Sequence, residues 1–299
     1  MTGPADGDSG DLSELEEDRL NRTARFAWGA VIVILIGVVV LVVYALTNAP
    51  VTQLTTHPAV TSSDVTTALD HVPPAVFDTV GVTAPNVQLV APAVLHGQPP
   101  LRSGGKPEVL YVGAEFCPFC GAERWPLIVA LSRFGHFTKL YNMQSAAQSV
   151  FSGIQTFSFA GASYRSRYVS FTGVELYSDA VTANGTYARI ATLSPDQSML
   201  VSKYGGAPQA GSAPGSAPFV DIANRLVTST SGFSPALIIR QSQAAIVSGL
   251  DHPDNQITQA IVASANQLSA GICVATGQQP DSVCASKGVR EAAVDLGIS

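Results

Sequence analysis

The chain has 299 residues, of which 46% are hydrophobic and 13% are charged, a composition that supports a large buried core and excludes a disordered chain. The formal net charge is −6, but the first 26 residues carry seven acidic and three basic side chains, which leaves the rest close to neutral. A near-neutral domain gives no sign of the basic face that nucleic-acid binding needs, so we expect no nucleic-acid partner. Four cysteines exclude a disulfide-dense scaffold but allow two pairs.

The first predicted element is a helix that crosses a membrane. Residues 28–46 form an uncharged apolar run of 19 residues, close to the roughly 20 that a bilayer-spanning helix needs. A core helix would show a polar face and a signal peptide usually has a shorter apolar region, so we favour an uncleaved anchor at residues 27–47. Positive charges precede the run and none follows until Arg102. We therefore expect a single-pass protein of the cell membrane, with residues 1–26 in the cytoplasm and the remaining chain extracytoplasmic.

Residues 48–70 are rich in Thr, Val, Pro and Ser and predict a tether, which leaves residues 71–299 for the extracytoplasmic domain. Its first clear element is a buried strand at residues 108–113. Apolar positions at helical spacing then predict a helix over residues 120–134, which Gly135 ends. A Cys-Pro-Phe-Cys motif, Cys117 to Cys120, therefore lies where a strand gives way to a helix.

Further along, apolar periodicity and turn-forming residues predict the remaining elements. They are a strand at residues 138–143, strands or a sheet extension within 155–176, a helix over 194–204 that opens with a capping box, a loop over 205–217, a hairpin of 219–223 and 226–230 around a turn at Asn224-Arg225, and helices from 234 and over 254–270.

Cys117 and Cys120 are the candidate catalytic residues. Disulfide exchange needs a thiolate, and a helix N-terminus favours that anion over the thiol. A second cysteine one turn later lies close enough to attack a mixed disulfide and release the product, and Pro118 fits the first helical turn. The alternatives are a static disulfide and a metal-binding pair. A zinc site usually adds a second CxxC or a Cys/His pair, and the five histidines do not cluster in the sequence.

The stretch VLYVGAEFCPFC at residues 109–120 resembles the strand, CxxC and helix of the thioredoxin superfamily. Ala217-Pro218-Phe219, before the predicted hairpin, resembles the second signature of that superfamily, in which a cis-proline packs beside the reactive pair. The resemblance implies an α/β, thioredoxin-like fold in which Pro218 is the cis-proline and contacts substrate backbone. It also implies a large insertion, about residues 144–205, between the CxxC helix and the cis-proline strand.

Over roughly residues 70–290 the chain also resembles the family called domain of unknown function 929, which comprises membrane-anchored thioredoxin-like proteins of bacteria and archaea. The most specific block is YVGAEFCPFCGAERWPLIVALSRFG at residues 111–135. Further blocks are residues 156–175, residues 218–224 and the segment with Cys273 and Cys284. This resemblance implies a fold and a compartment rather than an activity.

Departures from the thioredoxin pattern bear on the mechanism. Tyr111 stands where thioredoxins carry a buried Asp that aids proton transfer, and Phe116 replaces the Trp before the first cysteine. The Pro118-Phe119 dipeptide between the cysteines is more like that of the bacterial disulfide-bond proteins and glutaredoxins. Glu115 is either a group that tunes or relays protons near the pair or a solvated surface carboxylate.

The remaining cysteines, Cys273 and Cys284, bracket a turn-rich loop of ten residues after a predicted helix. In an oxidising compartment this arrangement predicts a structural disulfide. The alternative is a relay that exchanges electrons with Cys117 and Cys120, but Cys273 follows no helix-start signal and belongs to no CxxC motif.

Together these features predict an enzyme, a membrane-anchored extracytoplasmic thiol–disulfide oxidoreductase. Its redox-active disulfide would be Cys117–Cys120, with no other cofactor and no metal. Its substrates would be protein thiols or disulfides, it would need an unidentified redox partner, and the direction of electron flow is open. Two other functions stay open: a binding or assembly module with a static Cys117–Cys120 disulfide, and a metallochaperone for copper or zinc.

Overall fold

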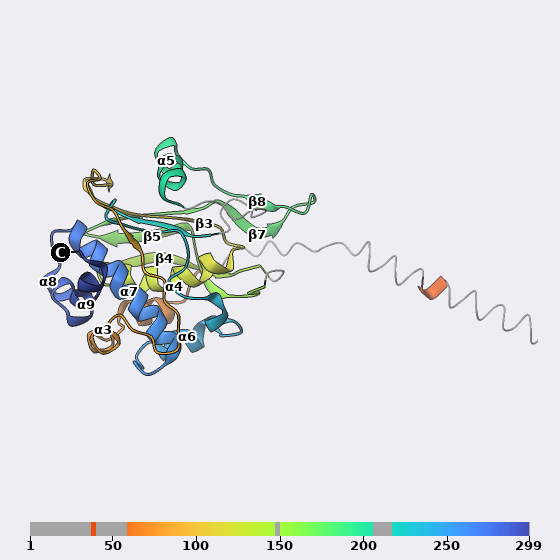
Figure 1. The fold of residues 1–299 in the computed structure, drawn as a ribbon. Coiled ribbons are helices and arrows are strands. Elements are labelled where there is room, and N and C mark those ends of the chain that lie inside the picture. Colours follow the sequence, from red (N-terminus) through yellow and green to blue (C-terminus); the bar gives the residue numbers. More distant parts are fainter. Residues whose placement is uncertain (1–36, 40–58, 147–149, 206–216, 299) are drawn as a thin grey trace, which may run out of the picture. The chain divides into compact units, whose positions relative to one another are not determined.

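The computed structural model describes residues 37–39, 59–146, 150–205 and 217–298 (Figure 1). The acidic tail, the anchor predicted at residues 27–47 apart from residues 37–39, and residues 206–216 of the predicted loop lie outside the described residues. The chain divides into two units, Met1–Leu54 and Thr55–Ser299, and the second contains the sheet and helices described below.

A mixed sheet forms the centre of this second unit, and helices flank it (Figure 1). Its strands run in the order β1 (Ala93–Val94), β10 (Leu226–Thr228), β9 (Phe219–Ile222), β3 (Lys106–Gly113) and β2 (Arg102–Ser103), and β6 (Ser170–Glu175) also pairs with β3. β3 and β6 are parallel, whereas β3, β9 and β10 are antiparallel neighbours. The mixed α/β class predicted from the sequence is therefore confirmed.

The predicted hairpin of β9 and β10 is also confirmed, with a small shift of its turn. Ala223 and Asn224 have positive φ angles of 52° and 56°, so they, rather than Asn224 and Arg225, are the central turn residues. Two consecutive residues with positive φ give the turn whose twist suits antiparallel strands. Asn is one of the residues that most readily adopt positive φ, and the Asp221 carboxylate holds the turn by accepting a hydrogen bond from the Asn224 backbone N–H at 2.7 Å.

The central helix is α4 (Pro118–Ser132), and it is buried continuously from Cys120 to Leu131. It packs against α7 (Gln256–Ala275) and against the hairpin of β4 (Gly135–Gln144) and β5 (Gln155–Ser166) (Figure 1). The expectation that Gly135 ends this helix is wrong, because the helix ends at Ser132 and Gly135 opens β4. A side chain at Gly135 would collide with the Arg165 carbonyl oxygen, so β4 and β5 can pair there only around a glycine.

α7 is the longest helix of the described residues and forms much of the core. Within the described part of the chain it is the helix that is long and apolar enough to cross a membrane, but 83% of its apolar window is buried inside this unit. Its apolar character is therefore explained by packing against α4, α9 (Lys287–Leu296) and α3 (Pro74–Val80).

The last part of the tether predicted at residues 48–70 is helical, and residues 48–58 lie outside the described residues. Residues 63–70 form α2 (Ser63–Asp70), because the Ser62 hydroxyl caps the first turn and Asp64 lies near the positive end of the helix dipole. Leu69 is buried, and the Ser132 hydroxyl donates a hydrogen bond to the Asp70 carboxylate at 2.8 Å. This segment therefore belongs to the folded unit.

The segment predicted as an insertion, about residues 144–205, contains strands and one helix. β5 and β6 are followed by a second hairpin, β7 (Tyr177–Val181) and β8 (Tyr187–Arg189), and by α5 (Pro195–Tyr204). The capping box of α5 is confirmed, since Ser194 and Gln197 exchange hydrogen bonds. The remaining elements are η1 (Pro235–Ile238), α6 (Gln243–Gly249) and α8 (Asp281–Cys284).

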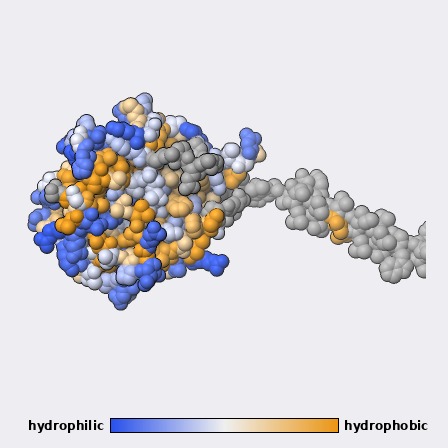
Figure 2. Space-filling model, viewed as in Figure 1, coloured by the Kyte–Doolittle hydropathy of each residue, from blue (hydrophilic) through white to orange (hydrophobic). Residues whose placement is uncertain are grey.

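On the face seen in Figure 1, hydrophobic and hydrophilic side chains alternate in small areas (Figure 2). The large exposed hydrophobic residues of the second unit come from different elements: Val60, Val90, Val150, Ile190, Met199 and Val294.

Candidate functional site

The cysteine pair lies at the junction of β3 and α4, as the sequence predicted. β3 ends at Gly113, residues 114–116 form a short connection, and Cys117 is the N-cap of α4. The Cys117 sulfur accepts a hydrogen bond from the backbone N–H of Cys120 at 3.1 Å. Pro118 occupies the first turn of the helix, where its missing N–H costs no intrahelical bond. The two sulfur-bearing residues thus face each other across one helical turn.

The environments of the two cysteines drive their pKa values apart, although both side chains are fully buried. Burial alone would raise the pKa of Cys117, but hydrogen bonds from Cys120 and the charge of Arg124 outweigh it, so this pKa lies below its ordinary value. Burial and the neighbouring Cys117 sulfur raise the pKa of Cys120 well above its ordinary value. A single thiolate shared by the pair therefore resides on Cys117, which suits it as the attacking nucleophile.

A buried ion pair beneath the cysteines was missed in the sequence. The Arg124 guanidinium donates two hydrogen bonds to the Glu175 carboxylate, at 2.9 and 2.8 Å, and a third to the carbonyl oxygen of Ala114. Both side chains are inaccessible to solvent. Arg124 lies one turn after Cys120 in a helix that is mostly apolar apart from the adjacent Glu123, and a charge at such a position is the signal that could have found the pair.

Glu115 is buried, with 4% of its surface exposed, so the solvated-surface interpretation is wrong. The Ser158 hydroxyl donates a hydrogen bond to its carboxylate. Burial raises the pKa of Glu115, and the nearby charge of Glu175 adds to the effect. Glu115 therefore belongs, with Arg124 and Glu175, to a group of buried charged side chains near the cysteine pair.

Tyr111 is also fully buried, on β3. The guanidinium carbon of Arg124 lies 5.6 Å from the centre of its ring, and the Phe159 ring meets it edge-on at a centroid distance of 4.8 Å. Its hydroxyl has no hydrogen-bond partner among the described residues.

Aromatic side chains next to the two cysteines in sequence pack against later segments of the chain. Phe116 stacks on Tyr187 of β8 at a ring distance of 3.9 Å and an interplanar angle of 5°, and it meets Tyr177 edge-on. Phe119, between the cysteines, meets Phe151 edge-on at 5.6 Å. The β7–β8 hairpin thus holds in place the residue that precedes the first cysteine.

We expect Tyr187→Ala to raise the rate of Cys117 alkylation by iodoacetamide about 3-fold to 10-fold. The reason is that an aromatic pair contributes about 0.5–1.5 kcal/mol beyond its buried area, so its loss favours opening around Phe116. The rate is measured by mass spectrometry of the reduced full-length protein. Tyr187→Phe keeps the stack and should react like the wild type; equal rates in all three proteins would show that the hairpin does not control access.

Pro218 lies next to this junction, but one prediction about it is wrong. β9 pairs with β3 through Phe219 and Val112, so Pro218 follows in register beside Gly113. The Ala217–Pro218 peptide bond is not cis; the cis bond of the described residues joins Gln279 and Pro280. Pro218 leads directly into an extended strand, and trans is the lower-energy form of an X–Pro bond by about 0.5–1 kcal/mol.

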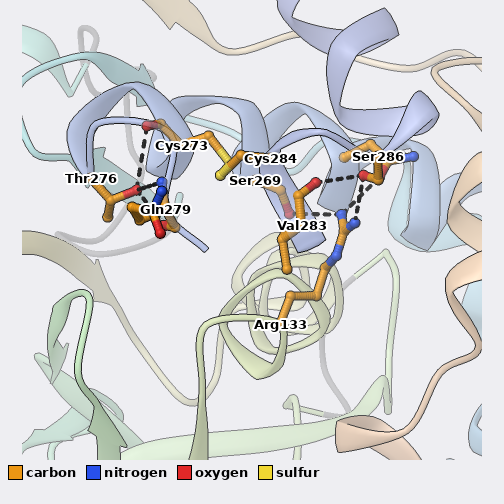
Figure 3. Close-up of a disulfide and its surroundings, with 9 residues drawn as sticks. Arg133, Ser269, Cys273, Thr276, Gln279, Val283, Cys284 and Ser286 are labelled. Atoms are coloured by element: carbon orange, nitrogen blue, oxygen red, sulfur yellow. Dashed lines mark hydrogen bonds between the residues drawn. A yellow bond between two sulfur atoms is a disulfide. The ribbon is translucent and has the colours of Figure 1, made fainter. Parts of the chain in front are cut away.

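The predicted disulfide between Cys273 and Cys284 is confirmed and joins the end of α7 to α8 (Figure 3). Arg133, just after α4, donates hydrogen bonds to Ser269, one turn before Cys273, and to Ser286, two residues after Cys284 (Figure 3). This disulfide therefore lies near the C-terminal end of α4, and Cys117 lies at the other end.

The distance between the two pairs bears on the relay interpretation. A helix of 15 residues spans about 22 Å, which is too far for direct exchange between the two pairs in this conformation. The geometry therefore favours a structural disulfide. Among the described residues, no group of three or more His, Cys, Asp or Glu side chains is placed to hold a metal ion.

The fold and the site together define a mixed α/β domain whose central helix begins with a buried cysteine pair in a CxxC motif. Residues 94–274 match the family described as a domain of unknown function (DUF929), and the chain belongs to that family. The resemblance to domain of unknown function 929 is thus confirmed over these residues. No curated protein and no solved structure matches the chain.

Proposed function

We propose that this protein is a membrane-anchored, extracytoplasmic thiol–disulfide oxidoreductase that acts through Cys117 and Cys120. The observation that carries the proposal is the placement of the two sulfurs: Cys117 is the N-cap of α4 and its sulfur accepts the Cys120 N–H at 3.1 Å, a setting that lowers the pKa of Cys117 while that of Cys120 is raised. Disulfide exchange requires these two roles: one cysteine is the thiolate that attacks, and the other stays a thiol until it resolves the mixed disulfide.

A thioredoxin-like fold is part of the proposal. Two features support it: β3, the CxxC motif and α4 follow one another, and Pro218 then precedes β9, a turn, β10 and later helices in the order that the resemblance implies. The antiparallel pairing of β9 with β3 supports it further, because it brings Pro218 to the strand end from which the motif emerges. β4, β5, β7, β8 and α5 are then elaborations between the two signatures.

In the reductive direction, the Cys117 thiolate attacks one sulfur of a substrate disulfide. The substrate S–S bond breaks, its other sulfur leaves as a thiolate and takes up a proton, and a mixed disulfide forms on Cys117. Cys120 then loses its proton and attacks the Cys117 sulfur, which releases the second substrate thiol and leaves Cys117–Cys120 oxidised. The reverse sequence, starting from the oxidised pair, oxidises a substrate dithiol.

Cys120→Ala should trap these partners, since the mixed disulfide on Cys117 then has no resolving thiol. The full-length variant is produced in its host membrane and analysed on non-reducing gels. We expect additional bands of high mass, which a reducing agent removes. The Cys117→Ala/Cys120→Ala variant is the matched control and should show none of them. Identical gels for the two variants would contradict the proposal.

The full burial of Cys117 favours one other function, a binding or assembly module in which the pair is a static disulfide. Structural disulfides typically have reduction potentials below about −300 mV, whereas catalytic pairs lie higher. Redox titration of the full-length protein against glutathione and dithiothreitol buffers separates the two: a potential above that value is the result expected for the oxidoreductase.

A further inference from the structure

Gly113 allows the Tyr111 hydroxyl to approach Cys120. A Cβ atom at Gly113 would collide with the hydroxyl oxygen of Tyr111 and would lie 3.1 Å from the Cys120 sulfur. The hydroxyl and the sulfur therefore border the same small space above the Gly113 backbone. Any larger residue at Gly113 would push the hydroxyl away from the sulfur.

The Tyr111 hydroxyl has no structural task in the described residues. It is fully buried and makes no hydrogen bond to any described residue, and a buried polar group in that condition calls for an explanation. A phenylalanine would fill the same space and keep the edge-on contact with Phe159 without burying a lone hydroxyl. The hydroxyl is therefore expected to act in a state of the site that the resting structure does not contain.

That state is the one in which Cys120 carries charge. During resolution of a mixed disulfide, Cys117 is covalently bound and neutral, and Cys120 has to become the nucleophile. Burial raises the pKa of Tyr111 well above its ordinary value, so the phenol keeps its proton and can donate but not act as a base. The Arg124 guanidinium carbon lies 5.6 Å from the Tyr111 ring centre, and its positive charge acts on Cys120 in the direction that favours the thiolate.

We propose that Tyr111 is a catalytic residue whose hydroxyl donates a hydrogen bond to the Cys120 sulfur as this sulfur becomes a thiolate. The inference rests on the oxidoreductase function proposed above. In the resolving step, the Cys120 thiol releases its proton to water and its sulfur attacks Cys117. The bond between Cys117 and the substrate sulfur breaks, and the departing thiolate takes up a proton. Tyr111 keeps its proton throughout and stabilises the charge on Cys120.

Tyr111→Phe tests the proposal with dithiodipyridine, a small disulfide that releases a coloured thione. Full-length reduced protein in detergent should release one equivalent as Cys117 is modified and a second as Cys120 resolves the mixed disulfide. Loss of a hydrogen bond to a charged group is expected to raise the pKa of Cys120 by about one unit. The thiolate population then falls about 10-fold, but the more basic thiolate is a better nucleophile, so the second phase should slow about 3-fold below that pKa.

The pH profile separates this role from a structural one. At pH above the pKa of Cys120 in both proteins the sign reverses, and Tyr111→Phe should become faster than the wild type, because only the gain in nucleophilicity remains. The first phase, which reports Cys117, should be unchanged at every pH. Tyr164→Phe is the matched control: it removes a hydroxyl that donates to the Leu131 carbonyl oxygen at 2.8 Å, near the C-terminal end of α4. It should leave both phases unchanged.

The outcomes are distinguishable. A second phase of equal rate and equal pH dependence in Tyr111→Phe and wild type would overturn the role of Tyr111 and leave the oxidoreductase function standing. A wild-type protein that releases only one equivalent would overturn the proposed function and the inference with it.

Discussion

Arg124→Met is expected to lower the free energy of unfolding by about 3–5 kcal/mol, because it leaves a buried carboxylate without its counter-charge. Arg124 and Glu175 are both inaccessible to solvent and are joined by two hydrogen bonds. The variant also removes the hydrogen bond to the Ala114 carbonyl oxygen, in the connection that leads to Cys117. Urea unfolding at neutral pH measures the loss, and the buried Trp125 on the same helix supplies the fluorescence signal.

A double variant distinguishes a lost ion pair from lost packing. Arg124→Met/Glu175→Leu removes both charges and keeps apolar volume, and replacement of a buried pair by hydrophobic residues is often neutral or stabilising. We therefore expect it to recover most of the stability that Arg124→Met loses. A double variant no more stable than the single variant would contradict this electrostatic explanation.

The same pair of variants separates stability from redox chemistry. Arg124 contributes to the lowered pKa of Cys117 through its charge. The double variant should therefore be stable and yet have a higher Cys117 pKa than the wild type, which the pH dependence of its alkylation rate measures.

Local patterns in the sequence were sufficient for the parts of the fold that depend on neighbouring residues. The strand before the motif, the start of α4, the capping box at Ser194 and the β9–β10 hairpin all follow from periodicity, caps and turn residues within a short window. These signals also placed the cysteine pair at the correct junction. Such elements form wherever their own residues favour them, so the rest of the chain is not needed to predict them.

Interactions between residues far apart in the sequence were missed or wrongly predicted. The Arg124–Glu175 pair joins residues 51 positions apart, and it exists because β6 lies parallel to β3 with Glu175 opposite Gly113. The burial of Glu115 likewise depends on Ser158 of β5. A sequence pattern contains the charges but not the strand register that brings them together, so these residues appeared solvated or went unnoticed.

The second large effect is expected at Glu123, on α4, three residues after Cys120. Its side chain is 2% exposed, and a single hydrogen bond from the Gly232 N–H, at 2.8 Å, reaches its carboxylate. Burial raises the pKa of Glu123 to about 8, from an ordinary value of 4.5. Between these two values the folded protein holds a proton that the unfolded chain has lost. The free energy of unfolding therefore falls as pH rises, by about 1.4 kcal/mol per pH unit from this group.

Glu123→Gln should remove this dependence, since the amide oxygen still accepts the Gly232 N–H but does not titrate. Near pH 4 the two proteins should be similarly stable, and by pH 8 the variant should be more stable by about 4 kcal/mol. The measurement is urea unfolding at a series of pH values, compared as the difference between variant and wild type. Taking this difference cancels the pH dependence of stability that other titrating groups contribute. One of them is Asp221, because burial raises its pKa to about 6.

Asp221→Asn is the matched control, because Asp221 is also buried, on β9, and its pKa is raised in the same direction. Its stability difference from the wild type should grow between about pH 4 and 6 and then stay constant. The difference for Glu123→Gln should continue to grow up to about pH 8. Because the two groups release their protons in different ranges, the pH at which each curve levels off identifies the carboxyl group responsible. A Glu123→Gln curve parallel to that of the wild type would show that Glu123 is already ionised in the folded protein.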